Sequence, residues 1–337
     1  MRIIVTGGAG FIGSNFIRYI LKNRLDWEVT NFDALTYAGN LANLQDIEGN
    51  KNYRFIKGNI SETEDVERLF SEEYDCLVNF AAETHVDRSL YNPSIFMKTN
   101  VLGTQLLLNF ALEKGIQRFV HISTDEVYGS LEEDKGMFDE SSPFRPNSPY
   151  ASSKASADMI CRSYYKTFDM PIIVTRGGNN YGPYQFPEKF IPLFITRALK
   201  DEPLPLYGDG LNVRDWIHVE DHCDAILTII EKGEIGQVYN IGAYNQKTNL
   251  EITGMILEIL GKPESLTRFV KDRPGHDRRY ALNCEKIKAE LGWSARIDFA
   301  EGLRETVEWY SDNKQWCEEV ISGDYMKFYE LHYKDRS

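Results

Sequence analysis

The stretch that decides the fold lies at the start of the chain: Arg2-Ile3-Ile4-Val5-Thr6-Gly7-Gly8-Ala9-Gly10-Phe11-Ile12-Gly13. A β-branched run leads directly into a glycine-rich turn, and the turn opens segment 11–22, whose apolar residues recur at helical spacing. Strand, turn and helix in this order are the context that a dinucleotide-binding fingerprint requires. The glycines let the backbone approach a pyrophosphate at the positive end of the helix. We therefore expect Gly7, Gly10, Phe11, Ile12 and Gly13 to bind a dinucleotide cofactor.

The first half of the chain repeats this alternation of strand and helix. Segments rich in β-branched or aromatic residues predict strands at 2–6, 28–33, 53–57, 76–80, 118–123 and 172–175. Segments with helical spacing of apolar residues predict helices at 11–22, 62–70, 94–114 and 148–168. This rhythm predicts an α/β fold with a doubly wound parallel sheet of the Rossmann type.

The second half of the sequence shows a less regular alternation of strand and helix patterns. After about Arg176 the pattern loosens into stretches rich in Pro and Gly, such as 181–183 and 272–275. The 337 residues also exceed the roughly 250–300 at which single cores stop growing. We predict a cofactor-binding domain over 1–176 and a smaller, loop-rich C-terminal domain over 177–337 that mainly binds substrate. Segments of the second domain can cross back into the first.

Composition excludes several classes of partner and compartment. The net charge of -13 argues against binding to nucleic acid, which needs a basic face. No apolar run approaches 18 residues, and a strand-like run follows Met1 at once, so we expect neither a membrane segment nor a signal peptide. The five cysteines are odd in number and never form a Cys-x-x-Cys pair, which favours structural thiols in the cytoplasm.

Asp33 indicates which cofactor the first domain binds. It ends the second predicted strand, 20 residues after Gly13, where a carboxylate can accept hydrogen bonds from the adenine ribose hydroxyls. An NADP site needs a cation for the extra phosphate, and segment 34–37 supplies none. The sequence therefore favours NAD.

Tyr150 and Lys154 are the candidate redox pair. They stand four residues apart at the start of a predicted helix, so both side chains fall on one helix face. A phenol with a pKa of about 10 is a weak base at neutral pH, but an adjacent ammonium and an oxidised nicotinamide stabilise the phenolate. Thr124, after the fifth predicted strand, can hold the hydroxyl that is oxidised.

These features resemble the extended short-chain dehydrogenase/reductase family over nearly the whole chain. The resemblance rests on the glycine turn, on Asn100-Val101-Leu102-Gly103-Thr104, on the Ser or Thr after the fifth strand and on Tyr-x-x-x-Lys. Segments 81–89 (Ala-Ala-Glu-Thr-His-Val-Asp-Arg-Ser) and 123–129 (Ser-Thr-Asp-Glu-Val-Tyr-Gly) look like those of the dTDP-glucose 4,6-dehydratases. The resemblance implies an NAD-dependent lyase that converts dTDP-glucose to dTDP-4-keto-6-deoxyglucose.

The consecutive acids Asp125 and Glu126 suit that reaction. When Tyr150 takes the C4 hydroxyl proton and NAD takes the C4 hydride, the new ketone acidifies the C5 proton. Glu126 can then act as the base, and Asp125, which keeps its proton through burial and a neighbouring like charge, as the acid for loss of the C6 hydroxyl. Hydride then returns to C6. Adjacent residues on a strand point to opposite faces, so both acids can face one site only if the strand has ended at Thr124.

The resemblance also implies the remaining contacts. Further cofactor-binding positions are Leu35, Thr36, Asn59, Ile60, Ala81, Ala82, Thr99 and Asn180, and Tyr150 and Lys154 also contact the cofactor. Substrate-binding positions are Thr84, Thr124, Asn179, Lys189, Phe190, Pro205, Tyr207, Arg214, Asn249, Arg273 and His276. Arg214 and Arg273 can chelate a diphosphate, and Tyr207 can stack on or flank the pyrimidine.

Two departures from the family pattern bear on this site. Asn59 stands where the family usually has an adenine-contacting Asp, although an Asn carbonyl can still accept from the adenine amino group. Gly177-Gly178 replaces bulkier small residues before Asn179, which puts the local rigidity of that strand in doubt.

Alternative functions are a UDP-sugar dehydratase, an epimerase or decarboxylase of the same family, and a non-catalytic NAD sensor. Asp125-Glu126 disfavours the epimerase and decarboxylase, and an intact catalytic set disfavours the sensor. His218 and His222 lack a third ligand in the sequence, so we expect no metal site. A homodimer through segments 94–114 and 148–168 is implied by the resemblance alone.

Overall fold

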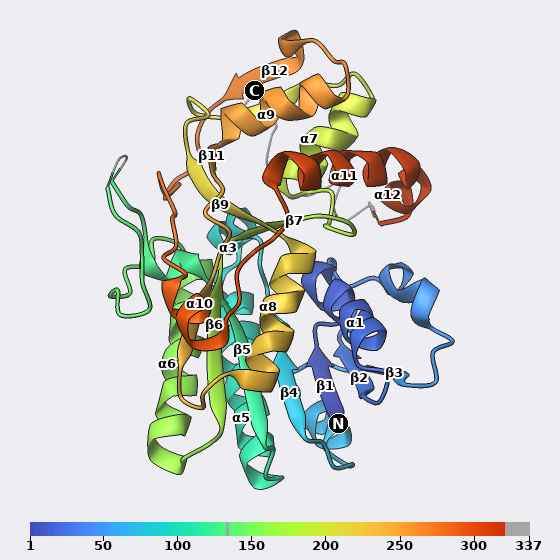
Figure 1. Ribbon diagram of the computed structural model, residues 1–337, viewed down its shortest axis with the longest axis vertical. Coiled ribbons are helices and arrows are strands. Elements are labelled where there is room, and N and C mark those ends of the chain that lie inside the picture. The colour runs from blue at the N-terminus through green and yellow to red at the C-terminus, as the bar shows by residue number, and fades with distance from the viewer. Residues whose placement is uncertain (133–134, 321–337) are drawn as a thin grey trace.

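The structure is a computed structural model that describes residues 1–132 and 135–320. Its centre is a seven-stranded sheet with the order β10-β6-β5-β4-β1-β2-β3 (Figure 1). Every neighbouring pair in this sheet is parallel. The strands are β1 (Arg2–Thr6), β2 (Glu28–Asp33), β3 (Tyr53–Lys57), β4 (Cys76–Asn79), β5 (Arg118–Thr124), β6 (Ile172–Gly177) and β10 (Val238–Ile241). The predicted doubly wound parallel sheet is thereby confirmed.

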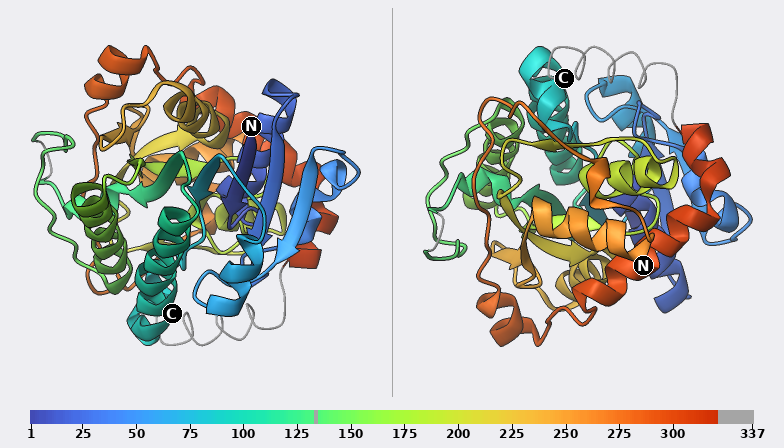
Figure 2. Two further views of the ribbon diagram at one scale, coloured as in Figure 1. Left: turned by 90° about the horizontal axis from the view of Figure 1, so that it is seen from below. Right: turned by 90° about the horizontal axis from the view of Figure 1, so that it is seen from above.

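Helices cover both faces of this sheet, which is why its central strands are almost continuously apolar. On one face lie α1 (Phe11–Asn23), α8 (Val219–Lys232) and α10 (Glu285–Leu291), and on the other lie α2 (Thr63–Leu69), α5 (Thr104–Glu113) and α6 (Pro149–Phe168). Figure 2 shows the two helical layers on opposite sides of the strands. The strand order reverses between β1 and β4, and such reversals open a crevice at the carboxyl ends of the strands.

The helix predicted over 94–114 is a composite. It consists of α4 (Pro93–Phe96), a π-helical segment η2 (Met97–Gly103) and α5, while a short helix α3 (Val86–Tyr91) precedes it. A Cβ at Gly103 would lie 2.7 Å from Ile60 Cγ1, so this position has room only for glycine. The helix therefore packs closely against the segment that follows β3.

The C-terminal part is more regular than its Pro- and Gly-rich sequence indicates. A three-stranded sheet has the order β11 (Gln246–Thr248), β9 (Val213–His218) and β7 (Asn179–Tyr181), and β8 (Leu204–Tyr207) pairs with β12 (Thr267–Val270). Helices α7 (Phe190–Leu199), α9 (Asn249–Ile259), α11 (Phe299–Asp312) and α12 (Lys314–Val320) pack around them above the central sheet (Figure 1). The expectation of a loop-rich region was wrong, because Tyr181, Phe194, Ile252 and Phe299 build a separate apolar core there.

Two further properties of the chain concern its thiols and its helices. All five cysteines are buried free thiols, as expected for structural residues. Within residues 1–132 and 135–320, the helices are too short or too polar to cross a membrane.

The strand β10 and helices α8 and α10 come from the second half of the chain yet complete the central layers. The predicted domain boundary at residue 176 stays a prediction.

Candidate active site

The glycine turn after β1 forms the floor of a cavity of about 420 Å³. Gly7 has a φ of +68°, which favours glycine, and a Cβ there would lie 2.7 Å from the Ala81 backbone nitrogen. A Cβ at Gly13 would collide with the Gly7 carbonyl oxygen. Gly10 caps helix α1 without a side-chain hydrogen bond, so the first turn presents backbone to the cavity. This cradle fits a dinucleotide pyrophosphate at a helix N-terminus.

Asp33 lies at the end of β2 and holds the turn in place. Its Oδ2 accepts a hydrogen bond from the Ala9 backbone N–H at 2.9 Å, and its Oδ1 accepts one from the Leu35 N–H at 2.7 Å. Each carboxylate oxygen keeps lone pairs for a ligand, and Asp33 lines the cavity. The ribose contact of Asp33 stays a prediction.

Leu35 departs from the expected arrangement. The residues that line the two described cavities do not include Leu35, whose side chain packs against the apolar core beneath the turn. Its backbone has a φ of +52°, a conformation that its N–H bond to Asp33 supports. The structure thus places Leu35 behind the cavity, where it positions Asp33.

The strand β5 ends at Thr124, as a shared site for the two acids requires. Asp125 begins a 3₁₀ turn, η3 (Asp125–Tyr128), for which Thr124 is the N-cap: its Oγ1 accepts from the Glu126 N–H at 3.2 Å. The Thr124 hydroxyl also donates to Asp125 Oδ1 at 3.2 Å. The change from strand to turn rotates the backbone between the acids, so Asp125 and Glu126 both line the cavity that contains Thr124.

The two acids differ in their electrostatic surroundings. Asp125 is 2% exposed, and its Oδ2 has no hydrogen-bond partner among the described residues. Burial, and after it the charge of Glu126, raises the pKa of Asp125 well above its ordinary value. Burial also raises the pKa of Glu126, but Arg273 and Arg214 oppose this rise. Asp125 is therefore the acid that holds its proton more firmly.

Tyr150 and Lys154 lie one turn apart on α6, close to these acids. The helix begins where Ser148 accepts from the Ala151 N–H at 3.1 Å. Tyr150 is 8% exposed; burial and the charge of Glu126 raise its pKa, while a hydrogen bond with Thr124 lowers it. The Tyr150 hydroxyl is therefore hydrogen-bonded to the Thr124 side chain at the end of β5.

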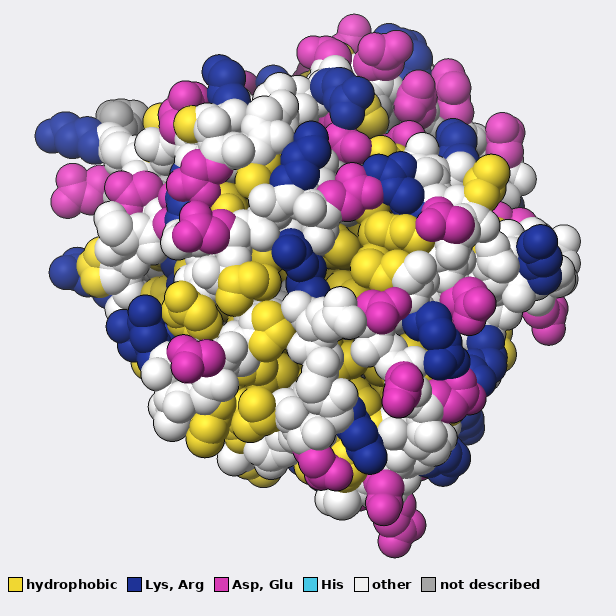
Figure 3. All heavy atoms as spheres, turned by 60° about the horizontal axis from the view of Figure 1, so that its bottom comes forward, with side chains coloured by type: hydrophobic (Ala, Val, Ile, Leu, Met, Phe, Trp, Pro, Cys, Tyr) yellow, Lys and Arg dark blue, Asp and Glu magenta, His cyan; other side chains and the backbone are white. Residues whose placement is uncertain are grey.

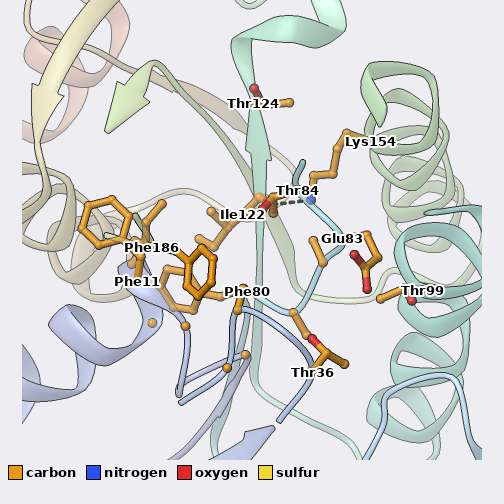
Figure 4. A pocket seen from close by; sticks show the side chains of 18 of the residues that line it. Phe11, Thr36, Phe80, Glu83, Thr84, Thr99, Ile122, Thr124, Lys154 and Phe186 are labelled. Atoms are coloured by element: carbon orange, nitrogen blue, oxygen red, sulfur yellow. Dashed lines mark hydrogen bonds between the residues drawn. The ribbon is translucent and has the colours of Figure 1, made fainter. Parts of the chain in front are cut away.

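Lys154 is tied to the strand beside it. Its Nζ donates to the Ile122 carbonyl oxygen at 2.6 Å, the dashed line in Figure 4, where Thr124 lies further along the same strand. Burial lowers the pKa of Lys154 to about 8, and Asp158, one turn further along α6, opposes this shift. The hydrogen bond of the ammonium thus goes to the β5 backbone. Stabilisation of the Tyr150 phenolate by its charge stays a prediction.

A second cavity of about 200 Å³ adjoins the first, and its lining includes the cations Arg214, Arg273 and Lys189. Arg214 is 6% exposed and donates to the Asp277 carbonyl oxygen at 3.0 Å. Arg273 lies 3.3 Å from Asp87, and Lys189 Nζ donates to the Thr84 carbonyl oxygen at 3.0 Å. One buried and two half-buried cations around one cavity favour an anionic ligand, even though the whole chain is acidic.

The two cavities collect nearly every predicted position. The first is lined by Gly7, Gly10, Phe11, Ile12, Gly13, Asp33, Thr36, Asn59, Ile60, Ala81, Ala82, Thr84, Thr99, Thr124, Asp125, Glu126, Tyr150, Lys154, Asn179, Asn180 and Lys189. The second is lined by Phe190, Pro205, Tyr207, Arg214, Asn249, Arg273 and His276, and it shares Thr84, Glu126, Asn179, Asn180 and Lys189 with the first. Leu35 is the predicted position outside both, and the ligand contacts of the others stay predictions.

Asn59 lines the first cavity in an orientation that we did not expect. Its side-chain oxygen accepts hydrogen bonds from the Ser61 N–H at 3.0 Å and from the Ser61 hydroxyl at 2.7 Å. These two bonds use both lone pairs of the carbonyl. The group left for a ligand is the amide nitrogen, a donor, and not the carbonyl that we expected to accept from adenine.

Sequence reasoning missed two buried residues at the site. Glu188 lines both cavities beside Arg88 and His85, at 3.4 and 3.5 Å, and burial raises its pKa to about 7. His222 lines the first cavity; its Nδ1 lies 2.7 Å from Asn180 Oδ1, and its Nε2 has no partner among the described residues. Glu188 precedes Lys189 directly, which is the one signal that could have drawn attention to it.

The two glycines before Asn179 have a steric reason. A Cβ at Gly177 would lie 2.8 Å from the His222 ring, and one at Gly178 would lie 2.7 Å from the Asp215 carbonyl oxygen. Gly177 pairs with Thr124 in the sheet, and the Gly178 N–H donates to the Ile241 oxygen at 2.9 Å. Close packing therefore requires glycine at both positions, and the effect on the local rigidity of this strand stays a prediction. His218 and His222 belong to no group of three or more potential metal ligands in the described residues.

Comparisons with known proteins agree with this geometry. The family model described as GDP-mannose 4,6 dehydratase matches residues 4–306. A dTDP-glucose 4,6-dehydratase from Streptomyces niveus is 50% identical over 328 residues, which cover 96% of this chain and 97% of that protein.

Solved structures give the same result. The crystal structure of dTDP-glucose 4,6-dehydratase from Bacillus anthracis in complex with NAD has a TM-score of 0.89 and 52% identity, covering 95% of this chain and 99% of that one. The dTDP-glucose 4,6-dehydratase from Streptomyces venezuelae, with NAD and TYD bound, has a TM-score of 0.92 and 49% identity, covering 95% and 100%. The chain therefore belongs to the dTDP-glucose 4,6-dehydratase family of NAD-dependent extended short-chain dehydrogenases/reductases.

Proposed function

We propose that this protein converts dTDP-glucose to dTDP-4-keto-6-deoxyglucose and that Thr124, Asp125, Glu126, Tyr150 and Lys154 carry the reaction. The observation that supports this most strongly is the pair of consecutive acids at the end of β5. Both line the cavity that also contains Thr124 and Tyr150. Oxidation at one carbon and elimination at the next need these groups around one sugar ring.

NAD fits the larger cavity. The glycine turn would hold its pyrophosphate, Asp33 its adenine ribose, and Thr99, Tyr150 and Lys154 would lie along the rest of the molecule. NAD bound there would supply the redox chemistry of the reaction, as acceptor of the C4 hydride and donor of that hydride to C6. The negative charge of Asp33 favours NAD over NADP, whose extra phosphate it would repel.

Tyr150 acts as the base for oxidation at C4. Its hydroxyl lies beside the Thr124 hydroxyl at the end of β5, so both groups can reach the same hydroxyl of the substrate. Thr124 orients that hydroxyl while Tyr150 takes its proton. The Lys154 ammonium, fixed on the Ile122 carbonyl oxygen, supplies positive charge behind this position.

Elimination divides between the two acids. A ketone at C4 acidifies the C5 proton, and Glu126, whose carboxylate Arg273 and Arg214 favour, removes it. Asp125 holds a proton because it is buried beside another carboxylate, and it gives that proton to the departing C6 hydroxyl. One water leaves and a C5–C6 double bond forms. When hydride is added at C6, Glu126 returns a proton to C5, which balances the reaction.

The smaller cavity binds the nucleoside diphosphate. Arg214, Arg273 and Lys189 line this cavity as cations that can hold a diphosphate, and Tyr207 would flank the base. Family membership favours the thymidine nucleotide over the UDP-sugar alternative and favours dehydration over epimerisation. Five buried free thiols support a cytoplasmic protein.

A homodimer is the assembly that the surface supports. Three large apolar side chains on η2 and α6 are exposed to solvent. Leu102 is 57% exposed, Met159 54% and Phe168 51%. Figure 3 turns the lower ends of α5 and α6 forward, and hydrophobic side chains gather at its lower left. Pairing of this face with a second copy would remove the exposed apolar surface from water.

The direct test is product formation from defined sugar nucleotides. The protein is incubated separately with dTDP-glucose, UDP-glucose and dTDP-galactose, and 4-keto-6-deoxy sugar is detected by its absorbance in alkali. We expect dTDP-glucose to give product and Asp125→Asn and Glu126→Gln to abolish it. Conversion of UDP-glucose to UDP-galactose without keto sugar would instead establish an epimerase.

A further inference from the structure

The strand order indicates where the adenine of a bound NAD would lie in the larger cavity. The turn after β1 receives the pyrophosphate and the end of β2 receives the adenine ribose. Strand β3 lies next to β2 at the edge of the sheet, and the residues that follow it, Gly58 to Ser61, line the same cavity. The base attached to that ribose therefore lies against the segment after β3.

In this segment, Asn59 presents a donor. Its backbone is fixed by the Asp65 carboxylate, which accepts from the Asn59 N–H at 2.9 Å. Its side-chain oxygen accepts twice from Ser61, which determines the orientation of the amide and turns the NH₂ group away from Ser61. The NH₂ group has no hydrogen-bond acceptor within the described chain, whereas its oxygen is fully engaged.

Adenine offers both kinds of group along its edge: the 6-amino group donates, and the ring nitrogens accept. A carboxylate at position 59 would select the 6-amino group as a partner. An amide held by Ser61 can donate to a ring nitrogen of adenine or, equally well, to a 6-oxo group. Position 59 therefore lacks the hydrogen-bond acceptor that would select adenine through its 6-amino group.

We propose that Asn59, held by Ser61, is a specificity-determining residue of the cofactor site, and that it makes the protein accept a 6-oxopurine dinucleotide about as well as NAD. The ligand is nicotinamide hypoxanthine dinucleotide, in which an oxo group replaces the adenine amino group. This inference rests on the proposed function only in placing NAD in the larger cavity.

Competition for the intact protein tests this proposal. Purified enzyme is exchanged to equilibrium in an excess of an equimolar mixture of NAD and nicotinamide hypoxanthine dinucleotide. Free nucleotide is removed by gel filtration, and the bound nucleotides are released and quantified by chromatography. For the wild-type protein we expect a bound ratio within about threefold of one.

Asn59→Asp should shift the bound ratio at least tenfold toward NAD, because a carboxylate accepts from the 6-amino group and repels a 6-oxo group. Ser61→Ala should shift it in the same direction to a smaller extent, because the amide oxygen then keeps only the backbone N–H bond and can turn toward the base more easily. The matched control is Asn50→Asp: Asn50 is exposed, lies outside the cavity and accepts from the Asn52 N–H at 2.9 Å, as Asn59 does from Ser61.

The outcomes separate the two assignments. A wild-type preference for NAD of more than tenfold, left unchanged by Asn59→Asp and Ser61→Ala, refutes the role of Asn59. If the protein retains neither nucleotide, the cofactor assignment itself fails. If Asn59→Asp does not fold, the response of Ser61→Ala decides the matter, because that change removes one hydroxyl from a half-buried position.

Discussion

Tyr150 is kept as a phenol by its own surroundings. Burial and the charge of Glu126 raise its pKa, and the Lys154 ammonium is bound to a backbone oxygen of β5 instead of to the phenol. Any positive charge brought into the adjoining cavity favours the phenolate. The proposed role of Tyr150 as a base therefore depends on positive charge from a bound ligand, because its own surroundings favour the protonated phenol.

Replacement of Tyr150 by Phe removes this base and retains the ring that packs on Phe96. We expect turnover to fall by roughly 100- to 10,000-fold, as for loss of a general base, and NAD to remain bound. Product assays together with the nucleotide content of the purified variant measure both effects. Unchanged turnover would show that another residue accepts the C4 hydroxyl proton.

Glu188 predicts a pH dependence of stability. Its folded-state pKa of about 7 exceeds the ordinary value of 4.5, because burial outweighs Lys189 and Arg88. A raised pKa stabilises the fold below pH 4.5, and that contribution is lost as the pH rises through 7. Glu188→Gln mimics the protonated form, so the variant should gain up to about 3 kcal/mol over wild type at pH 8.

At pH 5, where the unfolded-state carboxyl is already partly ionised, the gain of the variant should shrink to about 1 kcal/mol. Denaturant titration of both proteins at the two pH values gives the four numbers required. Groups that titrate elsewhere cancel in the difference between variant and wild type. An equal difference at pH 5 and pH 8 would contradict the raised pKa.

The residue types in the sequence predicted most of the residues that line the site. Where a prediction was wrong, local hydrogen bonds had set the orientation of the side chain. Asn59 and Leu35 were placed by motif position, but the orientation of an amide and the direction of a side chain depend on neighbours such as Ser61 and Asp33. Glu188 and His222 were missed because only tertiary packing brings them to the cavity.

At the scale of elements, the site depends on where strands end. The glycine turn follows β1, the acids follow β5, and Asp33 ends β2. The turn holds its shape through backbone contacts, since the Gly10 N–H donates to the Gly7 oxygen at 3.1 Å. The cradle is therefore a property of strand, turn and helix together.

Gly13→Ala and Gly254→Ala test this dependence as a matched pair. A Cβ at Gly13 collides with the Gly7 oxygen, whereas nothing lies within 4 Å of one at Gly254 in α9. We expect Gly13→Ala to lose at least tenfold in NAD affinity, and Gly254→Ala to gain about 0.5–1 kcal/mol in stability with normal affinity. Equal NAD affinity in both variants would remove the role of the turn.

The strands and helices of the first half were predictable because the spacing of apolar residues and the positions of the turn residues indicate the same element bounds. Strands β1, β2 and β3 have the predicted bounds. The π-helical segment η2 was not predictable, because its apolar spacing is that of an α-helix. Strand β10 has four residues and becomes a strand through its pairing with β6, far away in the sequence.

At the scale of the molecule, both halves of the chain build one site. The cofactor cavity belongs mainly to the central sheet and the smaller cavity to the C-terminal elements, while Glu126, Asn179 and Lys189 line both. A sugar held between a nucleotide and a cofactor would lie at these shared residues. The reaction therefore depends on the packing of α7, β7 and β9 above β5.

The proposed homodimer gives a prediction at this scale. Leu102→Glu places a charge on the apolar helical face and should convert the dimer to a monomer in sedimentation velocity. The control is Leu25→Glu, because Leu25 is 77% exposed and lies outside that face. A wild-type monomer, or a dimer that both variants retain, would place the contact elsewhere or remove it.

In the proposed reaction, one site oxidises C4, eliminates water across C5 and C6 and returns the hydrogen from C4 to C6. The fate of two hydrogens tests this sequence of steps. The substrate dTDP-glucose carrying deuterium at C4 is converted in ordinary water, and unlabelled substrate is converted in deuterated water; nuclear magnetic resonance then locates the label in each product. We predict deuterium from C4 at C6 in the first product and solvent deuterium at C5 in the second. Loss of the C4 label to water, or a C5 hydrogen that never exchanges, would contradict the proposed mechanism.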